Sequence, residues 1–162
     1  MAANPDTATE AKATEPAATG ERFRVLVAGG GVAALEAVLA LRDLAGERVA
    51  IELICPKEEF TLRALSVAQP FSGEEPRAVR LDDFCAEHEV DFRQDALAEV
   101  WGSQRRVLTA AGADLPYDAL LLATGARQVP ALPGARPFRG ALDAAWYEEL
   151  LASLKGGSVR SV

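Results

Sequence analysis

Three runs of consecutive apolar residues stand out in the pattern along the chain, within 23–28 (FRVLVA), 48–54 (RVAIELI) and 118–123 (DALLLA). Their apolar positions are continuous rather than alternating, which is typical of strands covered on both faces in a parallel sheet. Residues 32–44 (VAALEAVLALRDL) are strong helix formers with apolar positions three and four apart, and they predict a helix that Gly46 ends. The order strand, glycine turn, helix, strand predicts a right-handed βαβ unit.

The rest of the chain gives shorter signals. Residues 57–80, broken by prolines and a glycine, predict a loop with one short helix. Asp82 is predicted to cap the N-terminus of a helix that leads to a short strand at 90–94. A small β-meander is predicted from three segments, 97–101, 105–109 and 117–123, the last of which also re-enters the main sheet. A final helix is predicted at 141–154.

These elements predict the α/β class, with a Rossmann-like βαβ parallel sheet and a small β-meander. Residues 1–20 are rich in Ala, Thr, Glu and Pro and predict a disordered tail rather than a signal peptide. Residues 21–156 are expected to form the domain, and 157–162 to begin a truncated following strand or domain. No apolar stretch approaches the roughly 18–20 residues of a transmembrane helix.

Composition narrows the possible partners. The 162 residues carry a net charge of -7, which argues against nucleic acid as a partner. Cys55 and Cys85 belong to no CxxC pair, and His88 is the only histidine, so no metal site is predicted. This use of cysteine is typical of a reducing compartment, and we expect a cytoplasmic location.

The turn after the first strand carries the clearest chemistry. Residues 29–34 (GGGVAA) match the pattern GxGxxA. Gly29 permits the tight turn from strand to helix, Gly31 lets the backbone approach a pyrophosphate, and Ala34 lets the helix pack close to the strand. The N-terminus of the helix adds unpaired N–H donors and a partial positive charge. The motif therefore predicts a dinucleotide-binding site.

The residue that should bind the adenosine ribose is missing from its usual place. An Asp or Glu is expected about 20 residues beyond the turn, at the tip of the second strand. Cys55 stands there, while Glu52 lies inside the strand and Glu58 and Glu59 lie beyond it. Glu58 or a backbone group could substitute for the acid, so the way in which the ribose is bound stays open.

Three strings together resemble a known family: RVLVAGGGVAALEAVLALRDL, FTLRALSVAQPF and LPYDALLLATGARQVPALPG. They are similar to the FAD-dependent pyridine-nucleotide oxidoreductases, which include type II NADH dehydrogenases, sulfide:quinone oxidoreductases and ferredoxin reductase-like enzymes. Residues 123–125 (ATG), which follow a predicted buried strand, form the second signature beside the glycine turn at 29–34. A domain that binds only a nicotinamide cofactor has no reason to carry both signatures. The resemblance implies that residues 21–156 are the N-terminal part of an incomplete FAD-binding domain.

The resemblance also implies which residues meet FAD. The pyrophosphate is expected to contact Gly29, Gly31, Val32 and Ala33, and the adenosine ribose Cys55 with Pro56 or Lys57. Arg63 is expected beside the flavin or its phosphates, and the backbone near Leu97 beside the adenine. Ala123, Thr124 and Gly125 are expected to pass close to the cofactor after the last strand. Ala64 follows Arg63 where the family pattern has a proline. No catalytic acid or base is assigned.

In a complete enzyme of this kind, NAD(P)H would reduce the flavin, and the electrons would pass to an acceptor such as a quinone or ferredoxin. The chain has no CxxxxC, which argues against a dithiol mechanism. Chains of the family are longer, with an NAD(P)H-binding domain and a C-terminal segment that completes the FAD domain. We therefore expect this chain alone to hold at most the ADP half of FAD and not to turn over NAD(P)H. Two alternatives stay open: a truncated or split non-catalytic subunit that needs a partner chain or the missing C-terminal region, and a stand-alone NAD-binding domain.

Overall fold

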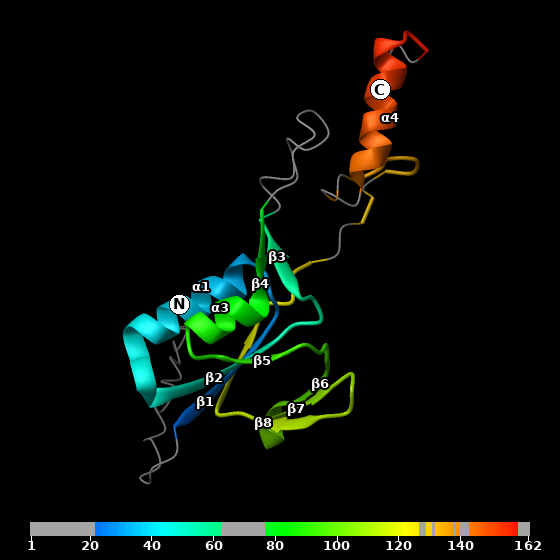
Figure 1. Cartoon of the computed structure of the whole chain (residues 1–162). Helices are drawn as coiled ribbons and strands as arrows, with labels where there is room; N and C mark the ends of the chain where they lie inside the picture. Colours follow the sequence, from blue (N-terminus) through cyan, green and yellow to red (C-terminus); the bar gives the residue numbers. More distant parts are fainter. Residues whose placement is uncertain are drawn as a thin grey trace, which may run out of the picture.

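The protein folds around a four-stranded parallel sheet (Figure 1). The computed structural model describes residues 22–62, 77–126, 129–130, 132–137, 139 and 143–158. The main sheet has the strand order β5-β2-β1-β9. Its strands are β1 (Phe23–Ala28), β2 (Val49–Ile54), β5 (Asp91–Arg93) and β9 (Ala119–Leu122). All three neighbouring pairs are parallel, which confirms the predicted Rossmann-like α/β class.

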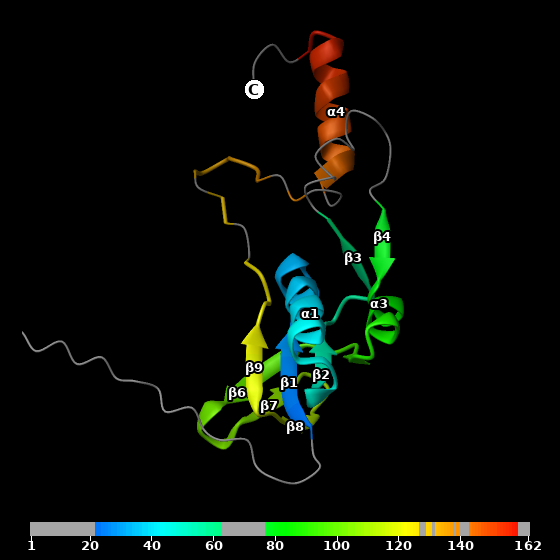
Figure 2. The ribbon, with the colours of Figure 1, turned by 90° about the vertical axis from the view of Figure 1, so that its left-hand side faces the viewer.

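The two faces of the sheet are covered by different elements, as Figures 1 and 2 show. The helices are α1 (Val32–Ala45), with the short 3₁₀ turn η1 (Gly46–Arg48) after it, α3 (Leu81–Glu87) and α4 (Ala144–Lys155). On one face, Val25 and Val27 of β1 pack in a cluster with residues of α1 and α3. On the other face, Leu26 packs against Val107 of the meander. Burial on both faces explains why the apolar runs are continuous.

Two small antiparallel sheets accompany the main one. The first pairs β3 (Glu59–Thr61) with β4 (Ala78–Arg80), so the prediction of a loop was wrong for these residues. The second consists of β6 (Leu97–Trp101), β7 (Arg106–Thr109) and β8 (Asp114–Pro116), with the 3₁₀ turn η3 (Gly102–Gln104) between the first two.

The third strand of the meander differs from its prediction. Residues 117–123 were assigned both to the meander and to the main sheet, and only the second assignment is confirmed. Ala119 pairs with Val25 and Leu122 with Ala28, so β9 belongs to the parallel sheet. β8 takes the third place instead, because Pro116 and Leu115 pair with β7.

The predicted boundaries of two helices also change. Asp82 does not cap α3: the N-cap is Arg80, and Asp82 lies in the first turn, where it forms an ion pair with Arg80. α4 begins at Ala144 rather than at 141, with Asp143 as its N-cap residue. The predicted tail (1–20) and the last strand (159–162) lie outside the described residues, as does 63–76, the central part of the segment 57–80 in which one short helix is expected. Among the helices that the structure describes, none has the length and apolar character needed to cross a bilayer.

Asp118 joins β9 to the start of β1, at the end of the sheet opposite the glycine turn. Its Oδ2 accepts a hydrogen bond from the backbone N–H of Arg24 at 2.8 Å, and the Arg24 Nε lies 3.2 Å from the same oxygen. The Arg24 side chain, followed by its backbone N–H, holds the pKa of Asp118 below the usual 3.8. Because the folded-state pKa is lowered, the carboxylate stabilises the fold above about pH 4, and this contribution is lost as the pH falls through the lowered value.

We expect Asp118→Asn to have a lower melting temperature than the wild type at pH 7, and we expect the two melting temperatures to become equal in acid. The difference from the wild type should shrink steadily below about pH 4, because the wild-type carboxyl then becomes neutral as well. Thermal unfolding of both proteins, followed by circular dichroism from about pH 7 to pH 2.5, measures the difference. A deficit that stays constant over this range would contradict the assigned role of the charge.

Candidate functional site

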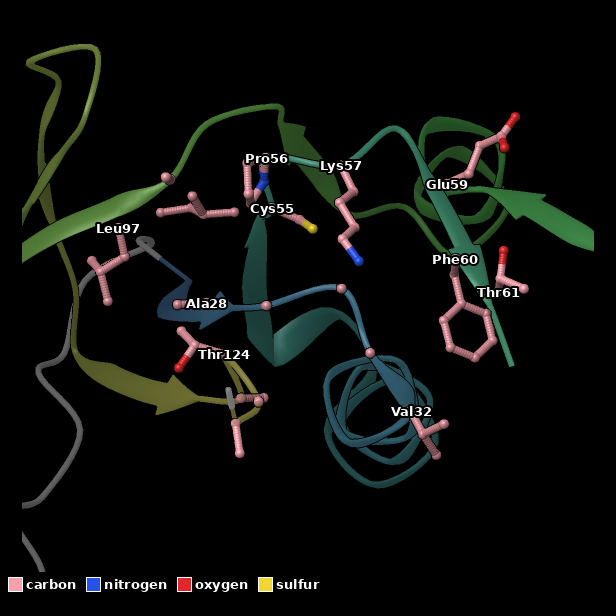
Figure 3. Close-up of a pocket in the computed structure, with 18 of the residues that line it drawn as sticks. Ala28, Val32, Cys55, Pro56, Lys57, Glu59, Phe60, Thr61, Leu97 and Thr124 are labelled. Atoms are coloured by element: carbon pink, nitrogen blue, oxygen red, sulfur yellow. The ribbon is translucent and has the colours of Figure 1, made fainter. Parts of the chain in front are cut away.

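A cavity of about 530 Å³ lies at the carboxyl ends of β1, β2 and β9 (Figure 3). Its size is within the range of small-molecule sites, and its place is where open α/β sheets bind ligands. Most of the site residues expected from the sequence line it: Gly29, Gly31, Val32, Cys55, Pro56, Lys57, Leu97, Ala123, Thr124 and Gly125. Arg63 lies outside the described residues. The structure thus gathers residues that are up to 96 positions apart, from Gly29 to Gly125, around one hollow.

β3 supplies a wall of the cavity that the sequence did not predict. Glu59, Phe60 and Thr61 line it, followed by Leu62. Ala96, directly before the predicted Leu97, also contributes. Phe60 follows two charged residues, Glu58 and Glu59, and this short segment shows no alternation of apolar and polar positions. The sequence pattern therefore could not predict a strand here or place it beside the glycine turn.

The three glycines of the turn have different roles. Gly29 has φ +134°, and a Cβ there would lie 2.1 Å from the carbonyl oxygen of Ala123. A Cβ on Gly30 would lie 2.5 Å from the Sγ of Cys55 and 2.9 Å from the Cδ1 of Leu81. A Cβ on Gly31 would meet nothing within 4 Å. Gly29 and Gly30 are therefore required by packing, whereas Gly31 leaves open space at the edge of the cavity.

Gly30 is a residue whose importance the sequence analysis missed. The motif GxGxxA accepts any residue at this position. Its restriction comes from Cys55 and Leu81, which lie 25 and 51 residues further along the chain. No signal within the motif itself could have found it.

The N-terminus of α1 offers unpaired donors to the cavity. Its N-cap residue, Gly31, has no side chain to accept a hydrogen bond, and the first turn holds no acidic residue. The N–H groups of Ala34 and Leu35 donate to the Gly31 carbonyl, at 3.0 and 3.1 Å. Within the described part of the chain, the N–H groups of Val32 and Ala33 have no acceptor. Such a helix end favours an anion.

Two predicted residues of the motif do not line the cavity. Ala34 has an exposed fraction of 0% and packs in the core with residues of β1 and β2, in agreement with the close helix packing expected of it. Ala33 is exposed on the first turn of α1, and only its backbone N–H is relevant to the site. Both residues shape the site through the backbone of the helix rather than through their side chains.

The tip of β2 carries a cation rather than an acid. Cys55 is buried, and its backbone N–H donates to the Arg93 carbonyl at 3.1 Å. Lys57 is exposed, and Figure 3 shows its side chain reaching toward the glycine turn while the Glu59 carboxylate points away. Lys57 forms no ion pair with any described residue. The ammonium group of Lys57 therefore points toward the turn that opens α1, and it lines the same cavity as Gly31.

Two of the three acidic residues near this tip, Glu52 and Glu58, have other partners. The Glu52 carboxylate forms an ion pair with Arg93 on β5, with 2.6 Å between Oε1 and Nε. The Glu58 Oε1 accepts a hydrogen bond from the Gln94 amide at 3.3 Å, outside the main cavity. Neither carboxylate takes the place of the expected ribose-binding acid.

The two cysteines are free and buried. Burial raises the pKa of the Cys85 thiol to about 11, so this thiol is neutral at physiological pH. The described residues contain no cluster of His, Cys, Asp or Glu side chains able to bind a metal ion.

A parallel sheet, a glycine turn opening an apolar helix and a cavity at the strand ends together define a Rossmann-like nucleotide-binding domain. The family model described as pyridine nucleotide-disulphide oxidoreductase matches residues 23–156. The chain belongs to this family. Its members bind FAD and use NAD(P)H as electron donor, which confirms the expected cofactors at the level of the family.

Solved structures support the same fold. Sulfide:quinone oxidoreductase from the hyperthermophilic bacterium Aquifex aeolicus has a TM-score of 0.73 and 21% identity, over 83% of this chain and 32% of that chain. NDH2 from Plasmodium falciparum in complex with NADH has a TM-score of 0.63 and 15% identity, over 88% of this chain and 31% of that chain. A ferredoxin reductase from Rhodopseudomonas palustris has a TM-score of 0.59 and 27% identity, over 83% of this chain and 35% of that chain. The chain thus spans about a third of the length of these proteins. Comparison with curated protein sequences gives no match.

Proposed function

We propose that this chain is the FAD-binding part of an NAD(P)H-dependent flavoprotein oxidoreductase. The observation that carries the proposal is the uncapped N-terminus of α1: the space at Gly31 is open, and Lys57, which forms no ion pair with any described residue, lines the same cavity and points toward this turn. When bound, FAD would accept a hydride from NAD(P)H and pass electrons to an acceptor such as a quinone or ferredoxin.

The residues of the chain would bind and orient the cofactor. The N–H groups of Val32 and Ala33 would donate to the pyrophosphate, and Lys57 would offset its charge. The apolar wall at Leu97 would pack against the adenine, and Thr124 would lie beside the cofactor at the end of β9. The ribose would then be held by the backbone around Cys55 rather than by a carboxylate, since Glu52 and Glu58 have other partners and the Glu59 carboxylate points away from the glycine turn.

The free edge of β9 supports the expectation that a further segment completes the domain. Within the described residues, β9 pairs with β1 alone. Leu122 is 58% exposed and Leu121 38% exposed at this edge. An apolar strand edge is a site for pairing with another strand. We propose that the completing strand comes from a C-terminal segment of the same protein or from a partner chain. The free thiols of Cys55 and Cys85 support a cytoplasmic location.

The test is a comparison of FAD, ADP, NAD⁺ and FMN as ligands of the purified chain. An absorbance scan from about 300 to 550 nm after gel filtration detects retained FAD, and calorimetry gives the affinity for each ligand. Binding of FAD and ADP without FMN supports the assigned ADP half-site. Preference for NAD⁺ over FAD would favour the stand-alone NAD-binding domain, and binding of none of the four ligands would contradict the proposal for this chain.

Lys57→Ala should weaken ADP binding about tenfold, because a charge-assisted contact with the phosphates is lost. It should also reduce the dependence of the affinity on salt concentration. Lys155→Ala is the matched control, since Lys155 is an exposed lysine in the last turn of α4 and is absent from the cavity. Equal affinities of the wild type and Lys57→Ala at low salt would remove Lys57 from the site.

A further inference from the structure

Asp95 lies behind the wall of the cavity without lining it. The next two residues, Ala96 and Leu97, form that wall where the chain passes from β5 to β6. The Asp95 Oδ1 accepts a hydrogen bond from the N–H of Ala96 at 2.7 Å and one from the N–H of Ala111 at 3.3 Å. One carboxylate therefore joins the cavity wall to the turn between β7 and β8.

Thr109 extends this link into the core of the meander. Its side chain is 1% exposed, and its Oγ1 accepts a hydrogen bond from the N–H of Ala113 at 3.0 Å. The Thr109 side chain is also the largest of the effects that lower the pKa of Asp95. The buried Thr109 thus supports the turn to which Asp95 bonds, because Ala113 and Ala111 belong to the same turn.

Both backbone polar groups of Ala96 are hydrogen-bonded within the protein. Its N–H donates to Asp95, and its carbonyl accepts a hydrogen bond from the N–H of Ala110 at 2.8 Å. The connection between β5 and β6 has only three residues, and Ala96 within it is hydrogen-bonded through both of its backbone polar groups. The wall therefore keeps one backbone conformation before any ligand arrives, and pre-organisation of this kind increases affinity.

We propose that Asp95 is a positioning residue that fixes the Ala96–Leu97 backbone as the adenine-facing wall and so sets the affinity for adenine nucleotides. The inference rests on the proposed function, which places the nucleotide in this cavity. The chemistry of the wall suits a purine: Leu97 and Ala96 are apolar, and they line the same cavity as Cys55 at the tip of β2, where dinucleotide folds bind the adenosine ribose. Asp95 itself contacts no ligand.

The experiment compares ADP with inorganic pyrophosphate, which lacks the adenosine. Asp95→Ala should lower the affinity for ADP about tenfold and leave the affinity for pyrophosphate unchanged. Asp95→Asn keeps an oxygen acceptor for Ala96 and should stay within about threefold of the wild type. Asp114→Ala is the matched control, because Asp114 lies in β8, directly after the turn to which Asp95 bonds, accepts a hydrogen bond from Arg106 and is absent from the cavity.

The possible results separate this inference from the proposed function. If the wild type binds neither ligand, the proposed function is wrong. If the wild type binds ADP and Asp95→Ala binds it equally well, or loses ADP and pyrophosphate to the same extent, Asp95 has no positioning role. Should Asp95→Ala fail to fold, Thr109→Val removes only the supporting hydroxyl and should lower ADP affinity about threefold with the same ligand selectivity; an unchanged affinity would overturn the inference.

Discussion

Gly29→Ala is expected to lower the free energy of unfolding by about 4 kcal/mol and to abolish nucleotide binding. The alanine would have to adopt φ near +134°, and its Cβ would lie 2.1 Å from the Ala123 carbonyl oxygen. Backbone cannot move aside as the end of a side chain can. β1 and β9 would have to separate at the point where they form the floor of the cavity. Urea unfolding followed by circular dichroism measures the loss.

Gly102→Ala provides the control for this substitution. Gly102 lies in η3, its φ is not positive, and an added Cβ would meet nothing within 4 Å. The same chemical change there should alter the free energy of unfolding by less than about 0.5 kcal/mol. Equal stability of the Gly29 and Gly102 variants would show that the strand-to-helix turn is not packed as described.

Gly31→Ser is expected to lower the affinity for ADP and FAD about a hundredfold while leaving the stability of the fold unchanged. The N-cap position has an extended backbone, φ −97° and ψ −177°, which serine adopts freely, and the space around it is open. A serine hydroxyl there would accept a hydrogen bond from the first turn of α1. It would therefore both occupy the approach of the pyrophosphate and cap donors that the anion would use.

This variant separates binding from folding. The free energy of unfolding should stay the same or rise by a few tenths of a kcal/mol, because serine is at least as good an N-cap as glycine. Calorimetry with ADP and urea unfolding of the same preparation give the two quantities. Full affinity in Gly31→Ser would mean that the phosphates do not approach this turn, and the proposed cofactor site would have to be abandoned.

The sequence by itself predicted the βαβ unit, because the signals for it are local. β1, α1 and β2 form where continuous apolar runs flank an amphipathic helix, and the turn between β1 and α1 shows its chemistry through consecutive glycines. The ATG segment after β9 could also be assigned from its own residues. These elements place the cavity at the correct end of the sheet.

Only the tertiary structure decided which segments pair across long separations. β3 and β4 are three residues each and largely exposed, so they carry no apolar pattern, and they form because each supplies the partner of the other. An apolar run such as β9 cannot indicate whether its partner is β1 or β7. The restriction of Gly30 by Cys55 and Leu81, and the support that Asp95 gives to the cavity wall, also depend on contacts between distant residues. Local pattern determined where the nucleotide site begins, whereas long-range packing determined its walls, because steric contacts and hydrogen bonds between distant residues leave no periodic mark in the sequence.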